Sequence, residues 1–314
     1  METEKVEKWL KDNSEATGLK EFHIEDLRQG ESNHNFIINS EGKKYVFRIS
    51  REISRRNRLK NEYKSLKLLK KAGMENVPEQ IFFSPDTQFG AVLIESFVGD
   101  SDLDRAGELE SLQIKKLSQL MSKAHKIKPE DYNQVFSKSK SSERSLKEIY
   151  RDEFDTWSRK PYKEYLDIAE DPIEELEHYF NKQKKLVNSF EDEKVDQRFI
   201  HSDLGFNIRA SDDEVFIVDW EYGTVGYPGH DIMILFEHGK FTEIQREEFL
   251  AEYRKHRDLG DKFEKVRKLH PGFLAFHDAV WAAKRVEREV EREDRRKMLE
   301  RKMEKLETFY KNRT

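Results

Sequence analysis

The fold of this chain is decided by the stretch His201-Ser202-Asp203-Leu204-Gly205-Phe206-Asn207, which is followed at short range by Phe216-Ile217-Val218-Asp219-Trp220-Glu221. Between the two motifs lie β-prone runs at 208–210 and 215–218, and the residues between those runs, 211–214, have a turn composition. We therefore expect a β-hairpin with one functional turn before it and another after it.

The two turns carry three polar side chains, those of Asp203, Asn207 and Asp219. Phosphoryl transfer needs such a set, because one carboxylate orients and deprotonates the attacking hydroxyl while an amide oxygen and a second carboxylate hold Mg²⁺ against the phosphates of ATP. Each of these residues alone is also a common turn residue. The ordered combination of all three favours the catalytic interpretation.

The two motifs resemble the catalytic and metal-binding motifs of the aminoglycoside phosphotransferase / choline kinase family, which has a protein-kinase-like fold. The resemblance implies Asp203 as the catalytic base, Asn207 and Asp219 as Mg²⁺ ligands, and His201 as a structural residue that braces the loop. The family pattern is His-x-Asp-x-x-x-x-Asn, whereas only three residues separate Asp203 from Asn207 here. Either the turn is tightened, with Gly205 absorbing the strain, or Asn207 does not reach the metal.

Composition narrows the class of protein. The 314 residues suffice for one large domain or two lobes, and 39% of them are charged, with a net charge of −5. This balance argues against a nucleic-acid binder. The absence of cysteine excludes disulfides, thiolate catalysis and Cys-ligated zinc. Because no apolar run approaches the roughly 18 residues of a membrane span, and the start of the chain lacks a signal-like segment, we expect a cytoplasmic protein without membrane insertion.

The first hundred residues give strand and helix signals in a definite order. Three strands, one helix and two strands are indicated, at 22–24, 36–38, 45–49, 54–72, 81–83 and 91–94. This is the order of a kinase-type N-terminal lobe, and the remainder reads as mainly helical. We therefore expect an α+β, two-lobed protein-kinase-like fold. Residues 1–97 would form a nucleotide-binding lobe with a five-stranded antiparallel sheet and a helix. Residues 98–314 would form a catalytic and substrate-binding lobe that holds the hairpin and a long charged C-terminal helix.

On the nucleotide side, the polar loop between the first two strands contains Ser32 and Asn33. It resembles the loop that covers the phosphates in choline-kinase-like enzymes, where small residues let backbone N–H groups approach phosphate oxygens; a simple hairpin turn is the alternative. The resemblance places Arg48 where kinases carry their phosphate-pairing Lys. Glu62, on the following helix, would be its ion-pair partner, and a solvated helix charge is the alternative.

The segment at 93–99 resembles the hinge between the lobes of a kinase. Backbone groups near Glu95 and Phe97 would bond the edge of the adenine ring. Because these are main-chain roles, the side chains at the two positions are only weakly diagnostic.

The substrate side resembles the choline and ethanolamine kinase branch, in which an acidic and aromatic pocket holds an ammonium group. Attraction between a cation and the face of an aromatic ring makes such a pocket physically reasonable. We expect Tyr222 and Trp281 as the aromatic residues, with Glu221 and Asp231 as acidic neighbours. A core position for Trp281 and a helix-capping role for Asp231 are the alternatives.

The sequence therefore predicts an ATP-dependent kinase of a small-molecule hydroxyl, with Mg²⁺ as cofactor and ATP as co-substrate. An amino alcohol such as choline or ethanolamine is the leading acceptor, and a sugar or aminoglycoside is the alternative. Because the loop between Asp203 and Asn207 is shortened, a nucleotide-binding pseudokinase or regulatory protein is the alternative of another class. The partners expected are the alcohol and ATP, with no nucleic acid, and a homodimer is left open.

Overall fold

The computed structural model describes most of the chain, namely residues 3–26, 33–50, 56–99, 106–137, 140, 143–159, 170–190, 192–211, 214–286 and 292–311. The chain divides into two compact units. The first comprises 1–140, 198–225 and 238–258, and the second comprises 141–197, 226–237 and 259–314. The boundary expected at residue 97 between a nucleotide-binding and a catalytic lobe stays a prediction.

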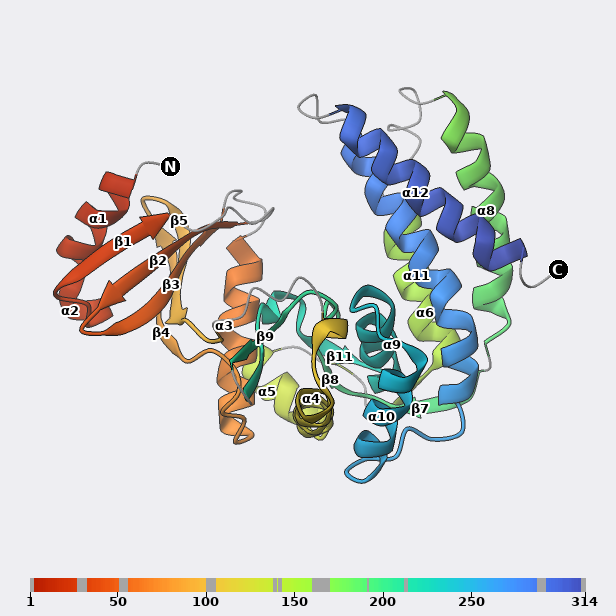
Figure 1. The fold of residues 1–314 in the computed structure, drawn as a ribbon, viewed down its shortest axis with the longest axis horizontal. Coiled ribbons are helices and arrows are strands. Elements are labelled where there is room, and N and C mark those ends of the chain that lie inside the picture. Colours follow the sequence, from red (N-terminus) through yellow and green to blue (C-terminus); the bar gives the residue numbers. More distant parts are fainter. Residues whose placement is uncertain are drawn as a thin grey trace. The chain divides into compact units, whose positions relative to one another are not determined.

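A five-stranded antiparallel sheet forms the N-terminal part of the first unit, with strand order β1-β2-β3-β5-β4 (Figure 1). Helix α3 lies between β3 and β4 in the sequence, so the predicted order of three strands, one helix and two strands is confirmed. The elements are α1 (Thr3–Asp12), α2 (Ser14–Thr17), β1 (Phe22–Asp26), β2 (Asn33–Ser40), β3 (Lys43–Ser50), α3 (Arg56–Lys71), β4 (Gln80–Thr87) and β5 (Gly90–Ser96).

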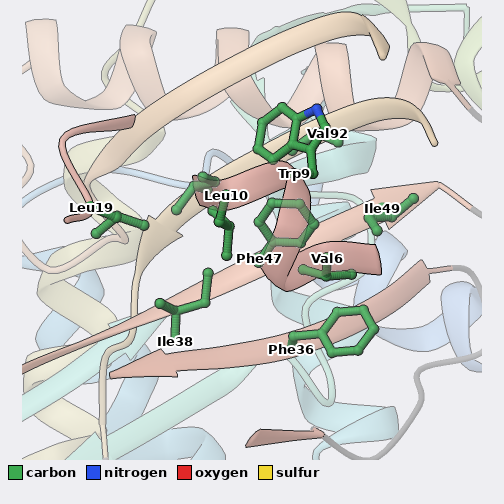
Figure 2. Close-up of a cluster of buried hydrophobic side chains, with 10 residues drawn as sticks. Val6, Trp9, Leu10, Leu19, Phe36, Ile38, Phe47, Ile49 and Val92 are labelled. Atoms are coloured by element: carbon green, nitrogen blue, oxygen red, sulfur yellow. The ribbon is translucent and has the colours of Figure 1, made fainter. Parts of the chain in front are cut away.

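One face of this sheet is covered by α1, as Figure 2 shows. Side chains alternate between the two faces of a strand, so every second residue of β2, β3 and β5 points to this helix. The ring of Trp9 meets that of Phe47 edge-on, with centroids 5.5 Å apart. The fully or nearly fully buried side chains of this layer are Val6, Trp9, Leu10, Leu19, Phe36, Ile38, Phe47, Ile49, Val92 and Ile94.

The opposite face of the sheet packs against α3, and this face carries Arg48, one of the predicted site residues. Leu59 of α3 forms a small buried cluster with Ala91 and Leu93 of β5. Arg48 of β3 is paired with Leu93 in the antiparallel register. Because directly paired residues share a face, strand register alone directs Arg48 at α3.

The rest of the first unit supports two short loops. Strand β8 pairs with β11, and β9 pairs with β10 to form the predicted hairpin. The elements are η2 (Ala106–Glu108), α4 (Ser111–Ala124), α5 (Pro129–Phe136), β8 (Arg198–Ile200), β9 (Ile208–Ser211), β10 (Glu214–Ile217), η3 (Trp220–Tyr222), β11 (Thr224–Gly226) and α10 (Glu243–Arg254). After the roles that the sequence predicts for them, the loop before the hairpin is called the catalytic loop (201–207), and the turn after it is called the metal turn (219–223).

The second unit is mainly helical and ends in two long helices, α11 and α12, which pack against each other (Figure 1). Its elements are β6 (Glu143–Ser145), α6 (Leu146–Arg159), α8 (Glu170–Asn188), β7 (Lys194–Asp196), most of α9 (Pro228–His238), α11 (Phe263–Val286) and α12 (Arg292–Lys311). Strands β6 and β7 pair. Leu299, Met303 and Leu306 are buried, so the charged C-terminal segment uses one apolar stripe for packing. Among the described residues, no helix is both long and apolar enough to cross a membrane.

Candidate active site

The catalytic loop and the metal turn are joined by the ring of His201, which is fully buried. Its Nε2 lies 2.9 Å from the carbonyl oxygen of Val218, and the backbone N–H of Asp203 donates to its Nδ1 at 3.2 Å. A carbonyl only accepts and a backbone N–H only donates, so the ring is held as the neutral Nε2–H tautomer. One imidazole thus fixes Asp203 relative to the strand end that leads into Asp219.

The shortened catalytic loop still closes on itself. Asn207 donates its Nδ2 to the carbonyl oxygen of Asp203 at 2.5 Å, and its backbone N–H donates to Leu204 at 3.2 Å. Its own carbonyl oxygen accepts the N–H of Val218 at 3.0 Å. Among the described residues, none donates to Oδ1 of Asn207. The loss of one residue therefore leaves Asn207 tied to both motifs, with its amide oxygen available as a ligand.

Gly205 contributes to this loop in a different way from the one expected. Its φ is not positive; the residue in the left-handed region is Ser202, with φ of 71°. A Cβ at position 205 would instead overlap the Cβ of His238. The expectation that Gly205 absorbs backbone strain is therefore wrong, and the physical reason for a glycine is the close approach of His238.

Replacing Gly205 by Ala should accordingly destabilise the fold. Overpacking of this kind typically costs about 1–3 kcal/mol. To relieve the overlap, either the catalytic loop or the segment that carries His238 must shift. Denaturant unfolding measures the loss. In a double-mutant cycle, G205A/H238G should recover part of it, because the second change removes the Cβ that is overlapped. A fully additive cycle would contradict the contact.

The metal turn begins at Asp219, which adopts the left-handed conformation with φ of 61° and ψ of 53°. Trp220 anchors the turn from within, since it is buried, donates its Nε1 to the carbonyl oxygen of Ile217 at 3.0 Å and stacks on Phe199. The carboxylate of Asp219 is 34% exposed and accepts Nη2 of Arg48 on Oδ1 at 2.8 Å. Its Oδ2 accepts no hydrogen bond from the described residues.

Arg48 is the centre of the site, because three carboxylates converge on its guanidinium. Nη1 lies 2.5 Å from Oε1 of Glu62 and 3.4 Å from Oε1 of Glu95, while Nη2 pairs with Asp219. Glu95 lies two residues beyond Leu93 on β5 and so shares the α3 face of the sheet with Arg48. Strand register and the helical position of Glu62 therefore bring the side chains of Arg48, Glu62 and Glu95 together, and Asp219 joins them from the metal turn.

The pKa values of these groups follow from burial in competition with Coulomb attraction. Burial raises the pKa of Glu62 well above its ordinary value, and Arg48 offsets only part of this. Burial likewise raises the pKa of Glu95 to about 7. Burial acts the same way on Asp219, but the charge and hydrogen bond of Arg48, together with His201 and Arg209, outweigh it and lower the pKa of that carboxyl. Asp219 therefore remains the carboxylate that is ionised most readily.

Replacing Glu95 by Gln should change how stability depends on pH. The carboxyl titrates near 4.5 when unfolded and at about 7 when folded, so between these values the folded state binds more protons and stability is lost as the pH rises. The free energy of unfolding of E95Q minus that of the wild type should therefore increase from pH 5 to pH 8, by up to about 3 kcal/mol. Urea unfolding at both pH values measures this, with E79Q at an exposed position as control. A constant difference, or a loss, would contradict it.

The cluster has the chemistry of a divalent-cation site. Carboxylate oxygens of Glu62, Asp219 and Glu221 lie within 4.8 Å of one another. Among the described residues, Oε2 of Glu62 is buried without a hydrogen-bond partner. Oxygen donors of this kind suit Mg²⁺. Asp219 keeps an unshared carboxylate oxygen and Asn207 an unshared amide oxygen, and their roles as Mg²⁺ ligands stay predictions.

Glu221 and Tyr222 lie on the metal turn, but they differ in exposure. Glu221 is buried, with Oε1 3.4 Å from Nη1 of Arg58 and Oε2 accepting Nδ2 of Asn33 at 3.4 Å. Tyr222 is 39% exposed, and the guanidinium of Arg58 lies over its ring at 4.9 Å. Burial raises the pKa of Tyr222 to about 12, and the carboxylates of Glu221, Asp203 and Asp219 each add to the rise. Asp203 is thus close enough to act electrostatically on this turn.

The other predicted site residues are Ser32, Phe97, Asp231 and Trp281. The backbone N–H of Phe97 donates to the carbonyl oxygen of Lys44 at 3.0 Å, so in this structure it is engaged within the protein. Ser32 lies outside the described residues. In the second unit, Asp231 is buried in the first turn of α9, and Trp281 is half-buried on α11. Their substrate-binding roles stay predictions.

Sequence reasoning missed three polar residues of α3 that face the metal turn. Arg58 lies four residues before Glu62, Asn61 lies one residue before it, and Ser65 lies three residues after it. This is the spacing of one helix face. Asn61 donates its Nδ2 to the carbonyl oxygens of Glu221 and Gly223. Their helical spacing from Glu62 is the signal that could have identified these three residues, provided that Glu62 is already known to face the metal turn.

Comparison with known proteins identifies the family. The chain matches the APH family, described as the phosphotransferase enzyme family, over residues 23–269, and it belongs to this family. It is thus an ATP-dependent phosphotransferase with a hydroxyl group as acceptor. No curated protein sequence matches the chain significantly.

Solved structures share the fold. The choline kinase LicA from Streptococcus pneumoniae is 19% identical with a TM-score of 0.65, covering 97% of this chain and 99% of its own. A GDP and kanamycin complex of APH(2'')-IIIa is 16% identical with a TM-score of 0.71, covering 98% and 99%. The spectinomycin phosphotransferase APH(9)-Ia, in complex with ADP and spectinomycin, is 14% identical with a TM-score of 0.68, covering 99% of both chains. The predicted α+β kinase-like fold is confirmed.

Proposed function

We propose that this protein transfers the γ-phosphate of ATP, with Mg²⁺, to the hydroxyl group of a small cationic amino alcohol of the choline or ethanolamine type. The observation that carries the proposal is the linked pair of loops. His201 holds Asp203 and the strand end before Asp219, and Arg48 fixes the carboxylate of Asp219. A base and a metal ligand are thereby held in one preorganised arrangement, which is what phosphoryl transfer requires.

Each residue has a separate role in the proposed reaction. Asp203 accepts the hydroxyl proton or orients the alcohol. Asp219 and Asn207 would hold Mg²⁺, which, when bound, neutralises charge on the phosphate oxygens. Arg48 provides the cation that pairs with the α- and β-phosphates, and Glu62 positions its guanidinium. Asn33 supports the nucleotide side through its bond to Glu221.

The preference for a cationic acceptor is supported by the metal turn and by one relative. Tyr222 presents a partly exposed aromatic ring beside several carboxylates, a setting that favours a cation. The guanidinium of Arg58 already lies over this ring at 4.9 Å, so an ammonium group would take the opposite face of the ring or replace that contact. LicA, whose fold is shared over nearly the whole chain, is a choline kinase. Glu221 is buried, which leaves Tyr222 as the more open of the two proposed substrate residues on the metal turn.

An aminoglycoside acceptor is the second candidate. It is favoured by the TM-score of 0.71 with a complex that contains kanamycin. The two candidates share the catalytic residues and differ only in the acceptor, so the same assay separates them.

The test is phosphorylated product formed from ATP and Mg²⁺ across choline, ethanolamine, several sugars and several aminoglycosides. We expect turnover with an amino alcohol, and its loss in the Asp219→Ala variant. Turnover with an aminoglycoside alone would overturn the proposed acceptor. Nucleotide binding without transfer to any compound would move the interpretation to a pseudokinase.

A further inference from the structure

One face of α3 is in direct contact with the metal turn. Arg58, Asn61 and Ser65 lie on this face together with Glu62, and the helix and η3 are in close contact. Gly223 permits this approach, because a Cβ there would lie 2.5 Å from Oγ of Ser65 and 2.8 Å from the ring of Phe199. The turn is therefore pressed against the helix along most of its length.

Asn61 makes the most specific contacts on this face. Its Nδ2 donates to the carbonyl oxygen of Glu221 at 2.8 Å and to that of Gly223 at 3.1 Å. A primary amide nitrogen carries two hydrogens, so one side chain satisfies both carbonyls. No other residue type of similar size presents two N–H donors at this distance from a helix backbone.

The metal turn needs an external support of this kind. Asp219 is in the left-handed conformation, which is unfavourable for a residue with a Cβ, although Asp tolerates it better than most. Such a conformation persists only where the surroundings fix it. The side chain of Trp220 fixes the start of the turn, and Asn61 fixes two carbonyls at its end.

We propose that Asn61 is a positioning residue for the metal site. By holding the carbonyls of residues 221 and 223, it keeps Asp219 in the conformation that presents its free carboxylate oxygen to Mg²⁺. Asn61 itself need not touch substrate, nucleotide or metal. The inference rests on the proposed function, because it assumes that Asp219 binds the metal.

The test compares binding of a non-hydrolysable ATP analogue with and without Mg²⁺ by calorimetry. For Asn61→Ala, we expect the Kd of the Mg²⁺ complex to rise about tenfold, as when a residue that orients a metal ligand is lost. The Kd without Mg²⁺ should change by less than about twofold, because the lost contacts lie on the metal turn. Asn61→Gln keeps the two donors and should recover part of the loss.

Asn76→Ala is the matched control. Asn76 also bonds the hairpin through its side chain, by donating Nδ2 to Oε2 of Glu214, the first residue of β10, at 2.7 Å. Its backbone carbonyl oxygen, which accepts the N–H of Ile217 at 3.2 Å, is kept by the change to Ala. It should leave both Kd values unchanged. Urea unfolding shows whether each variant is folded at the temperature of the binding experiment. The Asn61→Asp variant gives a second probe, because it keeps the size of the side chain and loses the two donors.

The outcomes separate the two ideas. If the wild type binds the analogue with Mg²⁺ dependence and folded Asn61→Ala and Asn61→Asp behave like it, the positioning role is wrong while the proposed function stands. Equal weakening with and without Mg²⁺ would also overturn it, because a general loss of structure would then explain the effect. Wild-type binding that is indifferent to Mg²⁺ would overturn both.

Discussion

Replacing Asp203 by Asn is expected to lower kcat by about 10²–10⁴-fold, the range that positioned acid–base catalysis typically supplies. The amide keeps the size of the side chain but cannot accept the hydroxyl proton. The backbone contacts that shape the loop, from its N–H to His201 and from its carbonyl oxygen to Asn207, are unaffected by the change. Nucleotide affinity should therefore stay within about twofold.

The measurement is kcat with the best acceptor, together with the Kd for ATP. Asp131→Asn on α5 applies the same chemical change away from the catalytic loop and should leave both values unaltered. If D203N retained more than about a tenth of wild-type kcat, Asp203 would not be the base, and another group would have to be sought.

Replacing Arg48 by Met should give the largest loss of stability. The change removes the cation from Glu62, Glu95 and Asp219 and leaves buried carboxylates without compensation. Breaking a buried ion pair from one side typically costs about 3–5 kcal/mol. Because burial already raises the pKa of Glu62 and Glu95, these carboxyls are neutralised more easily at low pH. The loss should accordingly be greater at pH 8 than at pH 5.

Urea unfolding at the two pH values tests this, and two further variants refine it. Arg48→Lys keeps the charge but loses the planar fork that reaches two partners at once, so an intermediate loss is expected. R48M/E62M removes a cation together with one of its anions and should recover part of the stability without recovering activity. An R48M variant within about 1 kcal/mol of the wild type at pH 8 would contradict the central place of Arg48.

Much of the fold could be predicted because local signals and global topology agree. Short β-prone runs mark β2, β3 and β5, and helical spacing marks α3, so the order of these elements along the chain follows from the sequence. The hairpin was equally clear, because two β-prone runs enclose a turn composition. Element order also placed Arg48 and Glu62 on neighbouring elements of the N-terminal part.

The side-chain environments of the site were harder to predict. Glu95 was assigned only a main-chain role, yet its side chain reaches Arg48, because the register between β3 and β5 puts both on the α3 face. The substrate role of Glu221 stays a prediction, and the sequence does not indicate that its side chain is buried against Arg58 and Asn33. Both contacts depend on how separate segments pack, and no local pattern encodes that. The reason for Gly205 likewise lies in the distant His238.

The most direct test is transfer of the γ-phosphate from ATP to choline and, in a separate reaction, to ethanolamine, followed by ³¹P NMR with the wild type, D203N and Asp219→Ala side by side. The account predicts that phosphocholine, or the corresponding ethanolamine product, accumulates only with Mg²⁺ and only with the wild type. Product formation that persists without Mg²⁺ or in Asp219→Ala would contradict it.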